Sequence, residues 1–334
     1  MLILGIESSC DDAAASVIET TRPGRANVRS SAVANQDDIH RAYGGIVPEL
    51  ASRNHVVSIL PVIDRALAEA GCRLGDIEGI AVTRGPGLVG SLLVGLMCAK
   101  GLAQTSGLPM VSVNHIEGHL LAPLLEHEVA MPYLALVVSG GHTALFAVEG
   151  FGRYRRRGST RDDAAGEAFD KVAKLMGLGY PGGKVIDDLA RRGNRRRVKI
   201  PRARVRGAPM DFSFSGVKTS VATFLRSEAG AATAPEDLAA SFQEAVVDML
   251  IRPTIGAARE LGVDTIALTG GVAANSRLRA RLSEAGANEG LRVVVPSLRY
   301  CTDNAAMIAL AGSWRLLGGE RDDLGIDAQA SLAL

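Results

Sequence analysis

The chain has 334 residues, 47 % of them apolar and 22 % charged, with a formal net charge of +1. This length favours two domains over one, and the balanced charge means that any signal for nucleic-acid binding must be local. The four cysteines are far apart without a C-x-x-C pair, and no apolar run could span a bilayer, so we expect a soluble cytoplasmic protein without a disulfide scaffold or a membrane segment.

Three pairs of predicted elements recur in the same order along the chain. The pairs are strand–turn–strand (2–19 and 134–149), strand–glycine turn–helix (79–103 and 265–279), and strand leading to a helix (109–121 and 291–316). An α/β protein can repeat any one of these units without duplication, but three in register favour an internal duplication. We therefore expect an α/β fold of two similar domains that face each other across a cleft.

We place the first domain at residues 1–132 and the second at 133–334. The second carries a helical insertion at about 160–260, and its last helix could pack back on the first domain.

The stretch HIEGH at 115–119 places two histidines four residues apart. On a helix, His115 and His119 share one face, as two ligands of one metal ion would. Glu117 lies about 200° round the helix from each, so it cannot be the general base that follows the first histidine in zinc proteases. The alternative is a pair of helix histidines bonded to solvent or core.

Asp303 opens the corresponding helix of the second half. If the halves face each other, this carboxylate approaches His115 and His119 across the cleft and leaves open positions on a metal. Alone, Asp303 would be read as an acid favoured at a helix N-terminus.

Three glycine-containing segments suit a ligand that carries a phosphate, a base or a sugar. The turn VVSGGHT (Val137, Val138, Ser139, Gly140, Gly141) and the helix entry TGGVAANSRLR (Asn275) offer N–H groups to an anion. A third segment, 162–188, could bind a sugar through Asp170, Gly183 and Asp187. The alternatives are a tight hairpin turn, a helix N-cap at Asn275 and a solvated acidic face. The matching turn of the first half is rich in acids (Glu7, Asp11, Asp12), so we expect its role to be indirect.

Residues 191–206 contain nine Lys or Arg and no acid, and 153–157 is a second basic run. Such runs attract phosphate backbones, so we take Arg195, Arg196, Arg197, Lys199 and Arg202 as candidates for binding a nucleic acid. The alternative is a solvated loop.

The ordered motifs resemble those of the tRNA adenosine threonylcarbamoyltransferase family, proteins once described as sialoglycoprotein endopeptidases. They are GIESSCDD, YGGIVPELASRNH, GPGLVGSLLVG, HIEGHLLAP, VSGGHT, DDAAGEAFDK, YPGG, DFSFSGVKT, TGGVAANSRLR and CTDNAAMIA, which run from residue 5 to 309. The basic runs are the stretches that match least.

The resemblance implies a duplicated fold like actin and the sugar kinases. It implies transfer of threonylcarbamoyl from threonylcarbamoyl-adenylate to N6 of the adenosine 3′ of the anticodon, in tRNAs reading codons that begin with A, with release of AMP. It implies one divalent metal on His115, His119 and Asp303, iron or alternatively zinc, and a bacterial-type protein. It also implies an inactive paralogous subunit and a small P-loop ATPase as partners.

The resemblance further implies adenylate contacts at Val137, Val138, Ser139, Gly140, Gly141, Asp170, Gly183, Asp187 and Asn275. The remaining rivals are an ATPase or sugar kinase of the same fold, and a metalloprotease.

Overall fold

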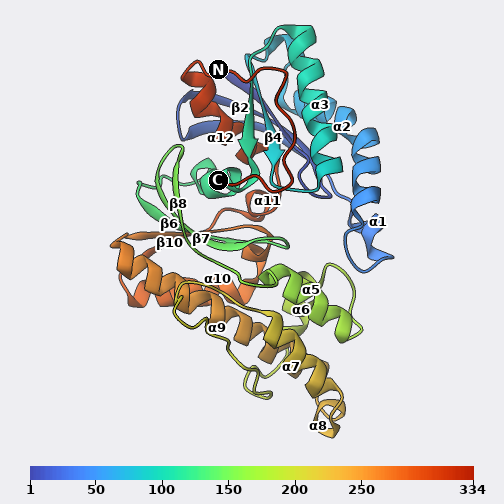
Figure 1. The fold of residues 1–334 in the computed structure, drawn as a ribbon, viewed down its shortest axis with the longest axis vertical. Helices are drawn as coiled ribbons and strands as arrows, with labels where there is room; N and C mark the ends of the chain where they lie inside the picture. Colours follow the sequence, from blue (N-terminus) through green and yellow to red (C-terminus); the bar gives the residue numbers. More distant parts are fainter. The chain divides into compact units, whose positions relative to one another are not determined.

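The computed structural model describes residues 1–334 and divides them into two compact units. Unit 1 comprises Met1–Glu128 and Thr302–Leu334, and unit 2 comprises Val129–Cys301. Each unit is built on a five-stranded mixed sheet with helices packed against it (Figure 1). The cleft between the halves stays a prediction.

The sheet of unit 1 has the order β3-β2-β1-β4-β5. The strands are β1 (Leu2–Glu7), β2 (Ala13–Arg22), β3 (Arg25–Ala34), β4 (Gly79–Gly85) and β5 (Met110–Asn114). The first three strands are antiparallel, whereas β4 and β5 run parallel to β1. The carboxyl ends of β1, β4 and β5 therefore meet at one edge of the sheet, which is where ligands bind in α/β folds.

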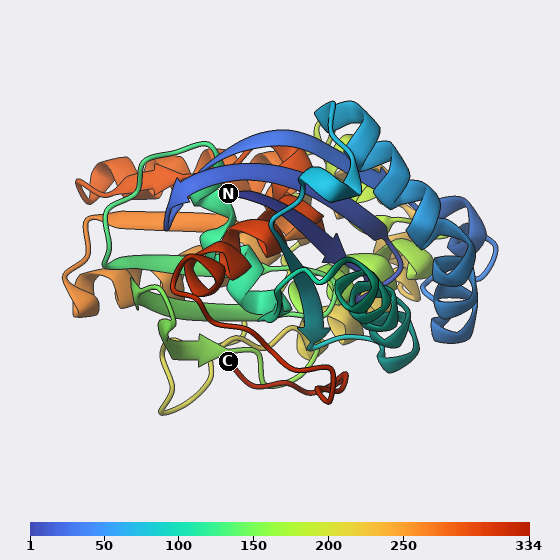
Figure 2. The same ribbon diagram turned by 90° about the horizontal axis from the view of Figure 1, so that it is seen from above.

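Helices cover both faces of this sheet. The helices of unit 1 are α1 (Asp37–Arg41), α2 (Pro48–Ala70), α3 (Val89–Ser106), α4 (His115–Leu121) and α12 (Ala305–Leu317), with short 3-10 turns at Leu74–Asp76 and Ala122–Leu125, and α2, α3, α4 and α12 contact the sheet. Alternate strand residues such as Leu4, Ile6 and Val82 pack with α2 and α3 in one core. The opposite face meets α12, which Figure 2 shows in red against the blue strands.

Small residues let α12 lie close to the sheet. A Cβ on Gly5 would lie 2.2 Å from the Ala305 carbonyl oxygen, and a Cβ on Gly312 would lie 2.6 Å from the Ala81 Cβ. Larger residues at these two positions would push the helix outward and disturb the residues that precede it.

Unit 2 repeats the plan with the order β10-β9-β6-β7-β8. Its strands are β6 (Tyr133–Val138), β7 (Thr143–Gly150), β8 (Arg153–Ser159), β9 (Thr265–Thr269) and β10 (Arg292–Val294). The hairpin β6–β7 corresponds to β1–β2, and β9 and β10 run parallel to β6 as β4 and β5 do to β1. This matched order is the one that the predicted duplication requires.

The helices of unit 2 pack around one core that includes Phe169, Phe214 and Phe242. They are α5 (Ala165–Leu175), α6 (Gly182–Ala190), α7 (Ser215–Leu225), α8 (Glu228–Ala231), α9 (Pro235–Leu261), α10 (Ser276–Asn288) and α11 (Leu298–Cys301), with a 3-10 turn at Gly271–Ala274. In neither unit is any helix both long and apolar enough to cross a membrane.

Candidate metal centre, nucleotide loops and basic groove

Helix α4 begins where β5 ends, and its first residue is His115. The Asn114 side chain caps the helix by accepting a hydrogen bond from the Ile116 N–H at 2.9 Å. The helix is close to α12, because a Cβ on Gly118 would lie 2.9 Å from Ile308 Cδ1. Gly118, the glycine of HIEGH, is thus explained by close packing against α12, the helix that follows Asp303.

Both histidines turn the same ring nitrogen toward one carboxylate. Asp303 Oδ1 lies 3.1 Å from His119 Nε2 and 3.7 Å from His115 Nε2. The candidate ligand atoms of the three residues all lie within 4.8 Å of one another. His119 is fully buried and His115 nearly so, whereas Asp303 is partly accessible. Two imidazoles and a carboxylate in this arrangement fit one divalent metal with open coordination positions.

A second layer of contacts fixes the His115 ring. Glu7 Oε2, at the end of β1, lies 3.0 Å from His115 Nδ1, and Ser9 Oγ lies 3.0 Å from the same nitrogen. Thr83, in β4, donates to Glu7 Oε2 at 2.7 Å. With Nδ1–H donated to a carboxylate, Nε2 is the ring nitrogen that faces Asp303, and it can bind a metal once its proton is displaced, an arrangement that is usual for metal-binding histidines.

Electrostatics agree with this pairing. Burial lowers the pKa of His115, but the charges of Glu7 and Asp303 outweigh it and raise the pKa to about 9. Burial raises the pKa of Glu7, yet the charge and hydrogen bond of His115 hold it below its ordinary value. For His119, burial dominates and the pKa is lowered. One histidine therefore holds a proton that a metal must displace, and the other is ready to coordinate.

Asp303 belongs to the same unit as the two histidines, which differs from our expectation. We expected it to approach from the second half, but Thr302–Leu334 belongs to unit 1, together with both histidines. The reason is the burial of α12, whose apolar residues pack on the sheet of unit 1. The N-cap of α12 is Asn304, which accepts from the Met307 N–H at 2.9 Å, so Asp303 is not the capping residue.

Glu117 faces elsewhere. Its Oε1 accepts a hydrogen bond from Trp314 Nε1, in α12, at 3.3 Å, and it is not among the clustered ligand atoms. A zinc-protease arrangement would need this carboxylate beside the metal.

In unit 2, glycines bring the predicted nucleotide segments together. A Cβ on Gly166, in α5, would lie 2.6 Å from the Ser139 carbonyl oxygen, and one on Gly270 would lie 2.3 Å from the Val138 carbonyl oxygen. A Cβ on Gly182, in α6, would lie 2.7 Å from Asp170 Cα. The turn after β6, the starts of α5 and α6 and the entry to α10 are therefore neighbours.

Three of the predicted nucleotide residues already have protein partners. Asn275 is the N-cap of α10, bonded to the Leu278 N–H at 2.9 Å, and its Nδ2 donates to Gln243 Oε1 at 2.8 Å. Asp170 Oδ1 accepts from the Gly182 N–H at 2.8 Å. Asp187 accepts from Ser276 Oγ at 2.8 Å. Asn275 is thus an N-cap, which was the alternative reading of its position. Contacts of Asn275, Asp170 and Asp187 with a nucleotide remain predictions.

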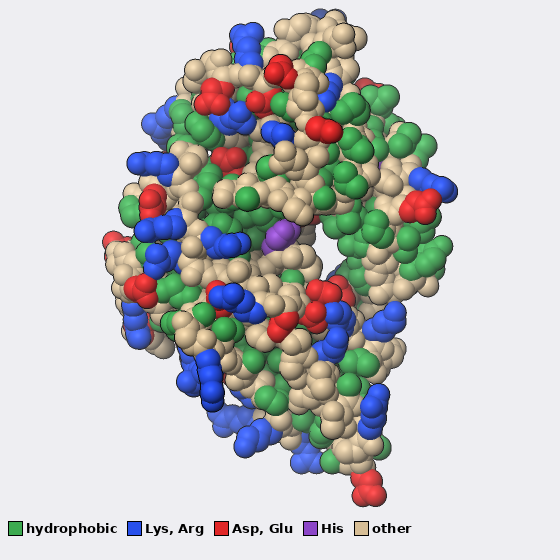
Figure 3. Space-filling view, viewed as in Figure 1, with side chains coloured by type: hydrophobic (Ala, Val, Ile, Leu, Met, Phe, Trp, Pro, Cys, Tyr) green, Lys and Arg blue, Asp and Glu red, His purple; other side chains and the backbone are tan.

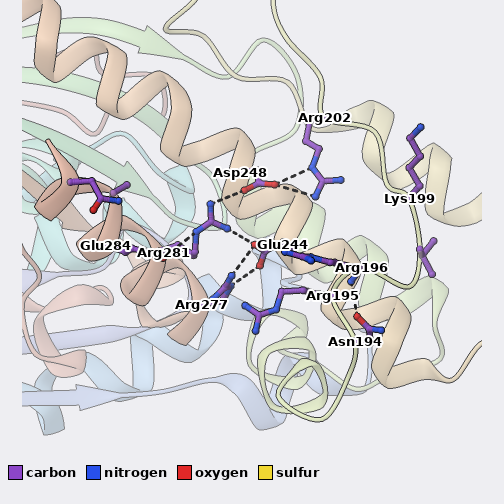
Figure 4. A pocket seen from close by; sticks show the side chains of 13 residues that line it. Asn194, Arg195, Arg196, Lys199, Arg202, Glu244, Asp248, Arg277, Arg281 and Glu284 are labelled. Carbon is purple, nitrogen blue, oxygen red and sulfur yellow. Dashed lines mark hydrogen bonds and ion pairs between the residues drawn. The ribbon is translucent and has the colours of Figure 1, made fainter.

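The basic run lines a groove of about 1060 Å³ between the loop and helices α9 and α10 (Figure 4). Arg195, Arg196, Lys199 and Arg202 line it, whereas Arg197 does not. Glu244 and Asp248 neutralise the inner cations, namely Arg277, Arg281 and Arg202. Arg195, Arg196 and Lys199 form no such ion pair, although the charge of Arg195 contributes to lowering the pKa of Glu244.

The sequence pattern of the tRNA N6-adenosine threonylcarbamoyltransferase family matches residues 27–310. The protein of that name from Syntrophotalea carbinolica is 53 % identical over 336 residues, covering all of this chain and 97 % of its own length. The chain belongs to this family.

Solved structures show the fold. Component A of Acidaminococcus fermentans (R)-2-hydroxyglutaryl-CoA dehydratase aligns with a TM-score of 0.55 at 16 % identity, over 95 % of this chain and 99 % of that one. Full-length HypF aligns with a TM-score of 0.59 at 13 % identity, over 95 % of this chain and 46 % of that one. The predicted actin-like fold is confirmed.

The metal centre is consistent with membership in the family. Mutation of Asp303 tests whether His115, His119 and Asp303 are its ligands. We expect Asp303→Ala to lower metal affinity by at least about tenfold. Losing a residue that only hydrogen-bonds to a metal ligand already costs about that much, and Asp303 is a proposed ligand itself. The fold should persist, because Asp303 is partly exposed. Glu117→Gln should keep its metal, since its Oε1 still accepts from Trp314. Metal analysis of both variants, with exposed Asp38→Ala as control, checks this. If Glu117→Gln lost its metal and Asp303→Ala kept it, Glu117 and not Asp303 would be the carboxylate ligand.

Proposed function

We propose that this chain transfers the threonylcarbamoyl group of threonylcarbamoyl-adenylate to N6 of the adenosine 3′ of the anticodon, in tRNAs reading codons that begin with A. In this reaction N6 attacks the carbamoyl carbon, the bond from that carbon to the phosphate oxygen breaks, the amine loses a proton and AMP leaves. The observation that carries the proposal is the full-length match to the family, joined to a buried two-histidine, one-carboxylate cluster.

The cluster suits the reaction because an aromatic exocyclic amine is a weak nucleophile. A divalent ion on His115, His119 and Asp303, for which we propose iron with zinc as alternative, would supply Lewis-acid polarisation of the threonylcarbamoyl oxygens. The chain's own contribution is to hold the ligands: Glu7 orients His115, and the partly exposed Asp303 leaves one side accessible.

For the adenylate we propose the glycine-lined region of unit 2. Backbone N–H groups of Gly140 and Gly141 could bind the phosphate, and neither glycine has a neighbour where a Cβ would stand. Val137, Val138, Ser139, Asp170, Gly183, Asp187 and Asn275 complete the proposed contacts. An ATPase of the same fold would have no use for HIEGH, and a protease would need Glu117 at the metal.

A single-turnover assay with unmodified tRNA and threonylcarbamoyl-adenylate tests the reaction. We expect one AMP for each modified adenosine formed, with any partner subunits supplied. Formation of ADP from ATP without nucleoside modification would support a kinase or ATPase and contradict the transferase.

The nucleotide contacts can be separated from helix capping at Asn275. Asn275→Ser keeps a capping oxygen but removes the amide, so α10 should remain stable while AMP affinity falls by roughly tenfold, the effect of losing about 1.5 kcal/mol. Asp170→Ala should act in the same direction. Calorimetry with AMP measures both, and exposed Asp188→Ala is the control. Unchanged affinity in both variants would remove these residues from the nucleotide site.

We propose that tRNA binds the basic groove of unit 2 through Arg195, Arg196 and Lys199. These loop cations have no ion-pair partners, unlike Arg202, and they lie within a few residues of one another. Arg197 is the weakest of the five candidates, since it does not line the groove.

Neutralising these three residues to Gln should flatten the plot of log tRNA affinity against log salt by roughly 2–3 units. Affinity for AMP should not change. The matched control neutralises three exposed, paired arginines of unit 1, Arg29, Arg41 and Arg53. An unchanged slope, or the same change in the control, would place tRNA elsewhere.

The proposed partners are an inactive paralogous subunit and a small P-loop ATPase, and a location in the cytoplasm follows from the tRNA substrate. Helices α2 and α3 expose an apolar surface that could receive the paralogue, seen as green side chains at the right-hand edge of Figure 3. Its residues are Val56, Val57, Leu60, Val89, Leu93 and Met97. Adjacent exposed apolar side chains of this number are typical of an interaction surface.

Val57→Glu should therefore abolish binding of the paralogue without unfolding the chain, because Val57 is 69 % exposed. Gel filtration of the mixed subunits and a thermal melt of the variant measure these effects. Leu324→Glu, an exposed apolar position outside α2 and α3, is the control. A complex of undiminished stability in Val57→Glu would exclude this surface.

A further inference from the structure

The final segment of the chain crosses the carboxyl ends of β4 and β5 in unit 1. The Gln329 N–H donates to the Arg84 carbonyl at 2.9 Å, and Arg84 Nε donates to the Asp327 carbonyl at 2.8 Å. Lys100, in α3, binds the Ile326 carbonyl. Figures 1 and 2 both show this dark-red segment running beside α3. It is held by backbone groups and by two cations of β4 and α3, so it is a docked element of unit 1.

The segment also explains Gly85. A Cβ at this position would lie 1.9 Å from the Gln329 carbonyl oxygen, a distance that no side chain could accommodate without moving the backbone. A glycine is therefore required at position 85, because the final segment passes directly over it.

From this position the segment reaches the cap of α4. Asn114 Nδ2 donates to the carbonyls of Leu332 at 3.4 Å and Ala333 at 3.3 Å, while its Oδ1 accepts from the Ile116 N–H. The amide is thus held from both ends. Because α4 has only seven residues, its geometry depends strongly on its cap.

A second route runs from the segment to the same histidine. The Gly87 N–H donates to the Ala330 carbonyl at 3.1 Å, and the next residue, Leu88, donates its N–H to the Ser9 carbonyl at 2.7 Å. Ser9 Oγ lies 3.0 Å from His115 Nδ1. The final segment therefore contacts the side chain of Asn114, which precedes His115, and it contacts Gly87, whose neighbour Leu88 binds the Ser9 carbonyl.

We propose that residues 326–333 form a strap that positions His115 for metal binding, and that Asn114 is the positioning residue through which the strap acts on α4. The strap has no hydrogen bond to the candidate ligand atoms of His115, His119 and Asp303. It fixes the direction of the first ligand of the cluster, as outer partners of metal sites do. The inference rests on the metal site of the proposed function.

Zn²⁺ affinity, measured by competition with a chromophoric chelator in the absence of tRNA and adenylate, tests the strap. Deleting residues 328–334 should weaken Zn²⁺ binding by roughly tenfold or more. Asn114→Ser keeps a neutral capping oxygen but loses both donations to the strap, so it should weaken binding by roughly three- to tenfold. In the deletion background Asn114→Ser should have little further effect, because both changes break the same contact.

Two controls separate positioning from general stability. Deleting Leu334 alone, which is 43 % exposed, should leave Zn²⁺ affinity unchanged. Arg65→Ala removes a bond to the Val33 carbonyl elsewhere in unit 1, so it should lower the melting temperature without lowering Zn²⁺ affinity.

Zn²⁺ affinity within twofold of the full chain in the deletion variant, or independent effects of the two changes, would overturn the proposal. If the deletion variant does not fold, Asn114→Ser decides alone. Because the titration contains no substrate, a chain that binds Zn²⁺ in a strap-dependent way but transfers nothing would refute the proposed reaction and leave the strap standing.

Discussion

The hydrogen bond between Glu7 and His115 determines how the candidate metal centre is arranged. Glu7 is completely buried, and its carboxylate is held by Thr83 and by the Ser9 N–H. A buried carboxylate without partners would be protonated or strongly destabilising. Here the sheet order supplies the partners, because β1, β4 and β5 are neighbours and their carboxyl ends carry Glu7, Thr83 and Asn114. The imidazole is thereby oriented before any metal arrives.

The same constraint requires α12 to lie close to the sheet. Asp303 can face the two Nε2 atoms only if the residues before α12 stay near α4, and Gly5, Gly118 and Gly312 permit that approach. Trp314 adds a hydrogen bond to Glu117, so α4 and α12 are joined on the side away from the ligands. The glutamate of HIEGH thus has a structural partner in place of a catalytic one.

Much of the fold and the pairing of the two histidines could be predicted from the sequence, because both depend on periodic patterns. Strand–turn–strand and strand–helix units repeat visibly, and they predicted two similar α/β domains. The spacing of His115 and His119 gave their common face. Asp303 was expected from the second half, because a repeat comparison follows chain order. The last helix was also allowed to pack back on the first domain, and the apolar face of α12 places it, with Asp303, in unit 1.

Other features have no periodic signal. Glu7 was seen only as one acid in a polar turn, and the strand order β1-β4-β5 was needed to bring it to His115. The capping role of Asn275 was recognisable from its place before a helix, but its bond to Gln243 was not. The final segment has neither strand nor helix periodicity, and no sequence pattern indicated that it passes over Gly85.

Anomalous diffraction from crystals of the Zn²⁺-loaded protein would show how the histidine rings are oriented. We expect one strong peak in unit 1, about 2.0–2.2 Å from Nε2 of both His115 and His119 and from a carboxylate oxygen of Asp303, with Glu7 still bonded to His115 Nδ1. A metal bound through His115 Nδ1, or a peak that lacks Asp303, would contradict this expectation.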